Sequence, residues 1–192
     1  MTRGAARAIC VFCASSPGAD PLYAETAQAV GIEIARRGWT LVYGGGSVGL
    51  MGILADAALD AGGWVIGVIP RFLYEREVGH DGLSELEIVE TLTERKVRMG
   101  DLSDAFLSLP GGVGTMDEMF EAWSWTLARL QDKPSGLLNT AGYYDDLIAF
   151  LDRSVADGLL KPAARQLLEV SADPFALLDC LDRTLPPDTT RR

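Results

Sequence analysis

Stretches of consecutive apolar residues alternate along the chain with segments in which apolar residues recur every three or four positions. The first pattern predicts buried β-strands and the second predicts amphipathic α-helices. The predicted strands are residues 8–13, 39–43, 64–69, 86–89, 105–109 and 135–138. The predicted helices are residues 21–37, 50–61, 91–102, 115–130 and 143–157. Because the strands are apolar almost throughout, we expect helices to cover both faces of their sheet.

This alternation predicts an α/β fold, a doubly wound, Rossmann-like parallel sheet flanked by helices. Residues 163–181 predict short helices and one edge strand. Residues 184–192 contain a Pro-Pro pair and few apolar groups, which is typical of a flexible tail. We therefore expect a single domain over residues 1–183. The charged, irregular region 71–83 follows the end of a predicted strand, where loops meet ligands in such folds.

Composition narrows the classes of partner. The chain has 192 residues and a formal net charge of −10. A general nucleic-acid-binding protein has a basic face, so we expect no nucleic-acid partner, although a small phosphorylated ligand needs only a local basic cluster. No apolar stretch approaches the roughly 20 residues of a membrane span, and the N-terminus lacks the apolar core of a signal peptide. These features predict a cytoplasmic protein with no membrane partner.

Two of the three cysteines, Cys10 and Cys13, form a C-x-x-C pattern that can indicate redox or metal chemistry. In a strand, however, positions i and i+3 point to opposite faces. Zinc would also need two more ligands, for which the chain offers only Cys180 and His80. We therefore interpret both as small apolar core residues in a reducing compartment, and we expect no metal site.

The predicted strand at 105–109 ends at a proline, and the glycines Gly111, Gly112 and Gly114 follow before a predicted helix. The N–H groups at a helix N-terminus attract anions, and glycine lets the backbone approach them closely, so we expect a phosphate here. Glu118 lies one turn into the same helix, where its carboxylate would repel that phosphate unless it had another task. This conflict indicates an active site. No Gly-Lys-Ser/Thr follows, which disfavours a triphosphate-hydrolysing loop.

Residues 44–49 spell a second glycine loop, G-x-G-x-x-G, after a strand and before a helix. The dinucleotide-binding fingerprint also requires an acidic residue at the end of the next strand, which here ends at Ile69 and Pro70. Two interpretations remain. The loop, with Gly45 and Gly46, faces a phosphate or ribose, or it is a tight turn that lets helix and strand pack closely.

Three cations, Arg95, Lys96 and Arg98, lie early in the predicted helix that precedes the strand at 105–109. Residues i and i+3 share one helix face, so Arg95 and Arg98 are expected to point the same way. Arginine can bond to a phosphate or a sugar oxygen through two nitrogens. A solvated charged face is the alternative, but the position beside an anion-binding turn favours ligand binding.

Residues 109–118, LPGGVGTMDE, resemble the P-G-G-x-G-T-x-x-E motif of the LONELY GUY (LOG) family. Those proteins are cytokinin riboside 5′-monophosphate phosphoribohydrolases, long mislabelled as lysine decarboxylases. Segments 11–18, 43–52, 68–70, 132–134 and 142–144 also look like family blocks, so the resemblance runs through most of the chain. It implies hydrolysis of the N-glycosidic bond of an N6-modified adenosine 5′-monophosphate, or of AMP, to free cytokinin or adenine and ribose 5-phosphate.

The resemblance also implies roles for single residues. Arg95 and Glu118 match the family's catalytic arginine and glutamate. The positions taken as substrate-binding are Arg95, Lys96, Glu77, Ser124, Ser15, Gly45, Gly46, Gly111, Gly112, Val113, Gly114 and Thr115. No cofactor is implied, and family members are homodimers or larger homo-oligomers with sites near the subunit interface. Thr93 stands where the family usually has a histidine, which leaves the effect on base preference open.

Two other functions were weighed against hydrolysis. A non-catalytic nucleotide-binding sensor or carrier could use the same fold, because a fold does not determine function. The Arg95–Glu118 pair favours an enzyme over a carrier. Lysine decarboxylation would need a lysine that holds pyridoxal phosphate, and the chain contains only Lys96, Lys133 and Lys161. Two of these precede a proline and the third belongs to the cationic cluster.

Overall fold

The computed structural model describes residues 7–185 of the chain. Seven strands form one sheet in the order β4-β3-β2-β1-β5-β6-β7, and every neighbouring pair is parallel. The strands are β1 (Ala8–Phe12), β2 (Thr40–Tyr43), β3 (Trp64–Pro70), β4 (Glu85–Val89), β5 (Ala105–Ser108), β6 (Ser135–Leu138) and β7 (Leu168–Ser171). The strand order reverses between β1 and β5, which is where doubly wound sheets bind ligands. The predicted fold class is confirmed.

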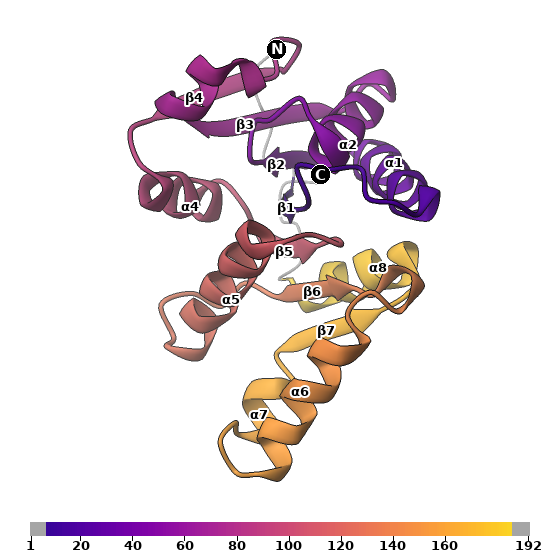
Figure 1. The fold of residues 1–192 in the computed structure, drawn as a ribbon, viewed down its shortest axis with the longest axis vertical. Helices are drawn as coiled ribbons and strands as arrows, with labels where there is room; N and C mark the ends of the chain where they lie inside the picture. Colours follow the sequence, from indigo (N-terminus) through magenta and orange to yellow (C-terminus); the bar gives the residue numbers. More distant parts are fainter. Residues whose placement is uncertain (1–6, 186–192) are drawn as a thin grey trace, which may run out of the picture.

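Helices lie on both faces of the sheet, as Figure 1 shows. The longer helices are α1 (Pro21–Arg36), α2 (Gly49–Asp60), α4 (Leu92–Asp101), α5 (Val113–Leu127), α6 (Asp145–Ala156) and α8 (Pro174–Thr184). Buried side chains of α1, α2 and α8 pack against one face, and those of α4, α5 and α6 pack against the other. Short turns complete the chain: α3 (Arg71–Leu73), π-helix η1 (Tyr74–Val78), 3-10 helix η2 (Thr140–Gly142) and α7 (Pro162–Arg165).

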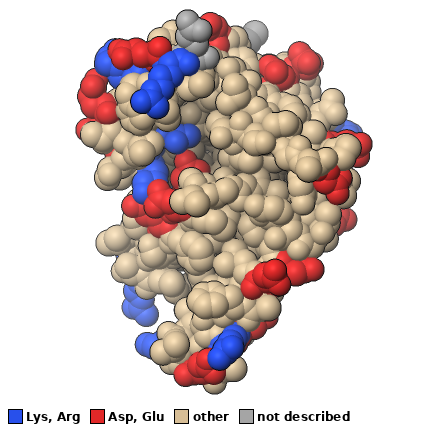
Figure 2. All heavy atoms as spheres, in the orientation of Figure 1, with Lys and Arg blue, Asp and Glu red and all other residues tan. Residues whose placement is uncertain are grey.

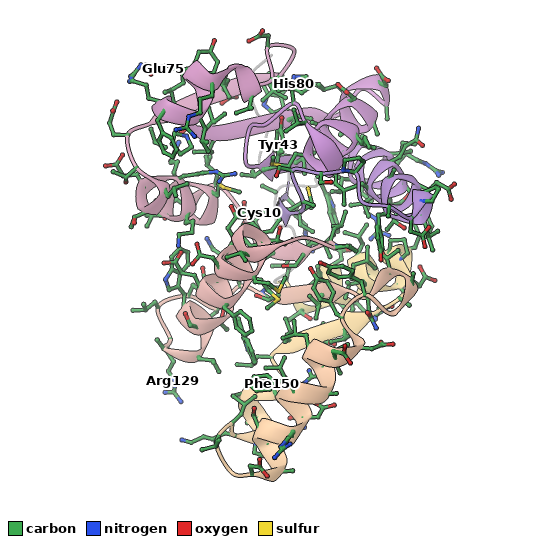
Figure 3. The ribbon with its side chains drawn as sticks, viewed as in Figure 1. Cys10, Tyr43, Glu75, His80, Arg129 and Phe150 are labelled. Carbon is green, nitrogen blue, oxygen red and sulfur yellow. The ribbon has the colours of Figure 1, made fainter. Side chains whose placement is uncertain are left out.

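The core follows from the alternation of side chains along the strands. In β1, Ile9 and Val11 pack toward α1 and α2, whereas Ala8 and Cys10 pack toward α4 and α5. Cys13, just beyond the strand, belongs to the first cluster, so the two cysteines face opposite sides of the sheet as predicted. Figure 3 shows Cys10 near the centre of the molecule. Both thiols are buried and unbridged, as their interpretation as core residues requires.

The element boundaries differ from the predictions in a few places. Helix α5 begins at Val113, two residues before the predicted start, because Gly112 serves as its N-cap. The region 71–83, expected to be irregular, contains α3 and η1. The edge strand expected within residues 163–181 is β7, and Thr184, assigned to the tail, still belongs to α8. The rest of the predicted tail, 186–192, lies outside the described residues.

Two surface properties bear on partners. Within residues 7–185, no helix is both long and apolar enough to cross a lipid bilayer. On the face shown in Figure 2, charged side chains gather mostly along the edges, and a broad central area carries no charge.

Candidate active site

A cavity of about 550 Å³ opens at the carboxyl ends of the strands, where the strand order reverses. Its walls are the loop after β1, the loop after β2, and the N-terminal turn of α5. Eight of the residues that the sequence analysis assigned to substrate or catalysis line it, namely Ser15, Gly46, Arg95, Gly112, Val113, Gly114, Thr115 and Glu118. These eight residues come from four separate segments of the chain, and the segment from β3 to η1 contributes a fifth part of the lining through Ile69, Leu73 and Val78.

Two helices bring the proposed catalytic pair together. Thr91 is the N-cap of helix α4, and its hydroxyl accepts the Glu94 N–H at 3.1 Å. The cap lies one turn before Arg95. Helix α5 carries Glu118 in its second turn. Nη1 of Arg95 lies 3.3 Å from Oε1 of Glu118, and the two side chains are only 12% and 11% exposed. This is a nearly buried ion pair at the cavity wall.

The guanidinium of Arg95 is held on two further sides by main-chain carbonyls. Nε donates to the Val68 carbonyl at 3.1 Å, and Nη2 donates to the Gly44 carbonyl at 3.2 Å. These acceptors belong to β3 and to the loop after β2, which are parts of the sheet framework. The arginine therefore presents a fixed positive charge to Glu118.

The electrostatics of Glu118 reflect competition between burial and charge. Burial raises the pKa of Glu118, and the nearby positive charge of Arg95 lowers it by less, so the pKa stays above that of an ordinary glutamate. Lys96 lowers the pKa further, whereas Asp117 and Glu121 raise it. A carboxylate whose pKa is shifted by burial and by a close cation is common among groups that do chemistry.

The N-terminus of α5 has the properties of an anion site. Its N-cap residue, Gly112, has no side chain to accept a hydrogen bond from the helix, and the first N–H groups of a helix have no partner within it. A Cβ added to Gly112 or Gly114 would meet no atom within 4 Å, so the space above them is open. A Cβ on Gly111, by contrast, would lie 2.1 Å from Oγ1 of Thr115, whose buried side chain covers that glycine.

Of the predicted substrate-binding residues with described side chains, four do not line this cavity, namely Gly45, Lys96, Gly111 and Ser124. Gly45 adopts a left-handed φ of 74° and lies against Ile69, where a Cβ would come within 3.1 Å. Gly111 lines a neighbouring cavity of about 200 Å³. Nζ of Lys96 bonds to Asp117 at 2.9 Å and to Glu121 at 2.8 Å.

Ser124 lies further along α5, where its exposed hydroxyl donates to the Glu121 carbonyl at 2.8 Å. Glu77 belongs to η1, and its side chain lies outside the described part of the structure. Burial lowers the pKa of Lys96, but its hydrogen bonds to Glu121 and Asp117 outweigh burial, so that pKa lies above its usual value. The substrate roles of these residues stay predictions.

Arg98 does not share the environment of Arg95. It binds both carboxylate oxygens of Glu87 on β4, at 2.6 and 2.8 Å. Helical spacing predicted that the two arginines point the same way, but Arg95 lines the cavity whereas Arg98 pairs with the edge strand β4. The three neighbouring cations thus have three separate sets of partners.

Sequence reasoning missed two kinds of site residue. The first is the apolar wall, formed by Phe12, Cys13, Val48, Met51, Ile69 and Leu73. These residues are spaced like core residues, and for all but Leu73 the only signal of a site was the resemblance of segments 11–18, 43–52 and 68–70 to family blocks. The second is a pair of tyrosines at 143 and 144, whose hydroxyls donate to the carbonyls of Gly111 at 2.8 Å and Leu109 at 2.6 Å. They hold the glycine turn from behind, and their only signal was the resemblance of residues 142–144 to a family block.

Sequence comparison identifies relatives over nearly the whole chain. A family model described as "possible lysine decarboxylase" matches residues 51–181. The probable cytokinin riboside 5′-monophosphate phosphoribohydrolase LOGL2 of Oryza sativa subsp. japonica is 42% identical over 180 residues, covering 94% of this chain and 74% of that protein. The cytokinin riboside 5′-monophosphate phosphoribohydrolase LOG3 of Arabidopsis thaliana is 41% identical over 186 residues, covering 97% and 86%.

Solved structures share the fold at lower identity. The molybdenum cofactor binding protein of Rippkaea orientalis superposes with a TM-score of 0.71 at 22% identity, covering 93% of this chain and 96% of that one. The Moco carrier protein of Chlamydomonas reinhardtii gives a TM-score of 0.68 at 23% identity, covering 93% and 97%. At this level the likeness concerns architecture alone.

The lysines do not fit the decarboxylase description of the family model. Pyridoxal chemistry would need a lysine that faces the cavity. Lys96 is bonded to two carboxylates, Nζ of Lys133 donates to the Gly100 carbonyl at 2.7 Å, and Lys161 is exposed at the start of α7. None of the three lines the cavity beside the Arg95–Glu118 pair.

Proposed function

The chain belongs to the LONELY GUY family of cytokinin riboside 5′-monophosphate phosphoribohydrolases, and we propose that it hydrolyses the N-glycosidic bond of adenosine 5′-monophosphates. The substrates are AMP or N6-modified AMP, and the products are adenine or free cytokinin together with ribose 5-phosphate. The observation that carries this proposal is the buried Arg95–Glu118 pair, which lies in the same cavity as an uncapped helix N-terminus.

The reaction uses the charge of Glu118. When the bond between the base and C1′ of the ribose breaks, positive charge develops on the sugar, as in other glycoside cleavages. The ionised Glu118 carboxylate stabilises this charge, and electrostatic effects of this kind contribute several kcal/mol. The hydroxyl of a water molecule then bonds to C1′, and its proton goes to the departing base. Arg95 favours the ionised form of Glu118, because its positive charge lowers the pKa of Glu118 against the effect of burial.

The 5′-phosphate binds at the N-terminus of α5, over Gly112 and Gly114. Glu118 lies four residues beyond Gly114, which is about 6 Å along the helix axis. The ribose spans this separation, with its phosphate end on the N–H groups and C1′ beside the carboxylate. Two negative groups can therefore share one cavity, because the substrate separates them and Arg95 neutralises one of them.

We also propose that the protein forms a homodimer or a larger homo-oligomer through α4 and α5. Exposed apolar side chains gather on these helices and the turn after them, namely Leu92, Val97, Val113, Phe120, Leu127 and Leu130. Val97 and Leu130 line a shared groove of about 480 Å³. Burial of this face would also cover Val113, which is 87% exposed at the cavity rim. Size-exclusion chromatography with light scattering tests the assembly, and we expect Val97→Glu to dissociate it. A wild type that is monomeric contradicts the proposal, as does an oligomer that Val97→Glu leaves intact.

We assign the protein to the cytoplasm. Its three cysteines are unbridged, as is usual in a reducing compartment. Fractionation of the source cells tests this assignment.

A product assay tests the activity. The purified protein is incubated with AMP and with N6-isopentenyl AMP, and the released base and ribose 5-phosphate are quantified. We expect both products in equal amounts, and we expect Glu118→Gln to lower kcat by about 100-fold or more. The proposal fails if no base appears or if Glu118→Gln cleaves as fast as the wild type.

A non-catalytic carrier is the second candidate, and the same assay separates the two. A carrier would bind AMP without releasing a base. The buried Glu118 argues against it, because a carboxylate weakens the binding of an anion and gains nothing unless positive charge develops during a reaction.

A further inference from the structure

The backbone conformation of Gly44 does not require a glycine, so the absence of a side chain there has another cause. It directly follows β2 and opens the glycine loop of residues 44–49. Unlike Gly45 and Gly49, it does not adopt a left-handed φ, so an alanine would suit the local backbone. A Cβ at this position would nevertheless lie 1.7 Å from Nη2 of Arg95 and 2.9 Å from its Cζ.

The space at Gly44 is occupied by the protein's own arginine. The Arg95 guanidinium lies against the glycine and donates from Nη2 to its carbonyl at 3.2 Å, while Nε donates to Val68 at 3.1 Å. Nη1 is then directed at Glu118, 3.3 Å away. The next nearest atom to a Cβ on Gly44 is Sδ of Met51 at 3.4 Å, which is ordinary contact. Only Arg95 therefore requires a glycine at this position.

We propose that Gly44 is a positioning residue: its missing side chain makes room for the Arg95 guanidinium to lie on the loop and meet Glu118. This proposal rests on the proposed function for its effect on turnover. It also explains why the loop spells G-x-G-x-x-G without the acidic residue of a dinucleotide site. The first glycine of the loop accommodates a catalytic side chain instead of a pyrophosphate.

Displacement of Arg95 has a consequence that a general loss of stability does not have. Arg95 is the main group that lowers the pKa of Glu118 against the effect of burial. A side chain at position 44 pushes the guanidinium away, so Glu118 takes up a proton at higher pH. The acid limb of the kcat profile then moves upward, while substrate binding at the N-terminus of α5 changes little.

The test combines Gly44→Ala with Arg95→Ala in a double-mutant cycle. We expect Gly44→Ala to lower kcat by about 100-fold, as misplacement of a catalytic group by about 1 Å can do, with KM changed less than about threefold. The acid limb of kcat and the NMR titration of the Glu118 carboxyl should both move to higher pH. Gly82→Ala, an exposed glycine outside the cavity, is the matched control and should leave kcat unchanged.

Unfolding in urea gives a readout that does not depend on turnover. Gly44→Ala should lower the unfolding midpoint in the wild type, but not in the Arg95→Ala background, where the clash is gone. Equal losses in both backgrounds overturn the proposal, as does an unchanged Glu118 titration. If Gly44→Ala does not fold, the double variant must fold, and its failure also overturns the proposal. A wild type that releases no base refutes the proposed function alone, because the titration and the unfolding cycle still decide this inference.

Discussion

The two glycine loops look alike in sequence but use their glycines differently. Each follows a strand, precedes a helix and lines the same cavity. In the first loop, a Cβ at Gly44 would strike Arg95. In the second, a Cβ at Gly112 or Gly114 would meet nothing within 4 Å. Gly44 of the first loop therefore makes room for a side chain from a distant helix, whereas Gly112 and Gly114 of the second loop face open space.

The loops are also held in place by different bonds. The first is tied by main-chain bonds to the segment after η1, with the Ser47 N–H donating to Val78 at 2.8 Å and the His80 N–H donating to Gly45 at 3.0 Å. Figure 3 labels Tyr43, whose hydroxyl donates to Gly46, and His80 close to this region. These bonds use both donors and acceptors of the loop, which suits a rigid support.

In the second loop the bonds are one-sided. The carbonyls of three successive residues, Leu109, Pro110 and Gly111, accept hydrogen bonds from protein donors. The donors are the hydroxyls of two tyrosines and the N–H of Ala14. Because the carbonyls are turned toward the protein, the N–H groups that follow are left for an anion.

The largest expected effect comes from a charge placed in the open space of the second loop. In Gly114→Asp the new carboxylate would lie about 4 Å from the bound phosphate, and two charges at that distance repel by about 4 kcal/mol at an effective dielectric constant near 20. We expect kcat/KM to fall roughly 1,000-fold. The fold should persist, because acidic residues are favourable in the first turn of a helix. Gly82→Asp is the control, and an unchanged KM for Gly114→Asp would contradict the assignment of the phosphate.

The pH dependence of kcat tests whether Arg95, which the first loop holds in place, affects the ionisation of Glu118 beside the second loop. Only ionised Glu118 stabilises the sugar, so kcat should fall tenfold per unit as pH drops below the pKa of Glu118. Because burial raises that pKa, the limb should lie above the usual glutamate value of about 4.3. Lys96→Met should move the limb upward by less than a variant that displaces Arg95, since Lys96 affects that pKa less. A limb below about pH 4 would contradict this account.

A smaller effect is expected from Gly114→Ala, which tests whether the fold tolerates a methyl group in the open space beside Gly114. In Gly114→Ala the methyl group enters the cavity but meets no protein atom, and alanine favours a helix over glycine by up to about 1 kcal/mol. We expect a modest rise in the free energy of unfolding together with a rise in KM of about tenfold. Urea titration and steady-state kinetics measure the two quantities. Destabilisation would show that the fold requires a glycine at this position.

The smallest expected effect concerns Arg98, three residues from Arg95 on the same helix. Its partner is Glu87, and both side chains are partly exposed, at 43% and 29%. An ion pair of this kind contributes at most about 1 kcal/mol. Arg98→Ala should therefore leave kcat and KM within about twofold of the wild type, with Arg95→Ala as the contrasting variant. A loss comparable to that of Arg95→Ala would show that the cations act as one cluster.

Much of the fold was predictable, because the patterns that determine it are local. Apolar runs and helical spacing predicted six of the strands and the main helices, and the seventh strand, β7, was expected as an edge strand. The second glycine loop was predictable as a turn between a strand and a helix, and its role as an anion site stays a prediction. The helix boundaries moved by a few residues where a cap, such as Gly112, decided the start.

The candidate site was predictable only in part. The conflict between an anion-binding turn and Glu118 identified the place, and the family resemblance supplied Arg95 as its partner. The first loop was left with two interpretations, a ligand loop or a tight turn, and the structure supports a third role, as the support for a side chain. The tyrosines behind the second loop were missed because aromatic residues usually serve packing.

By itself, the sequence determined the order of the elements, the two turns at strand ends and the chemical groups available to a site. Periodicity and turn chemistry act between neighbouring residues, so they can be read along the chain. The family resemblance named Arg95 as the partner of Glu118, but only the tertiary structure decided how the neighbouring cations are divided among their partners. Arg95, Lys96 and Arg98 are close in sequence, yet one bonds to Glu118, one to Asp117 and Glu121, and one to Glu87. That choice depends on how α4 packs over β3 and β4, and contacts between distant elements follow from packing geometry that no local pattern contains.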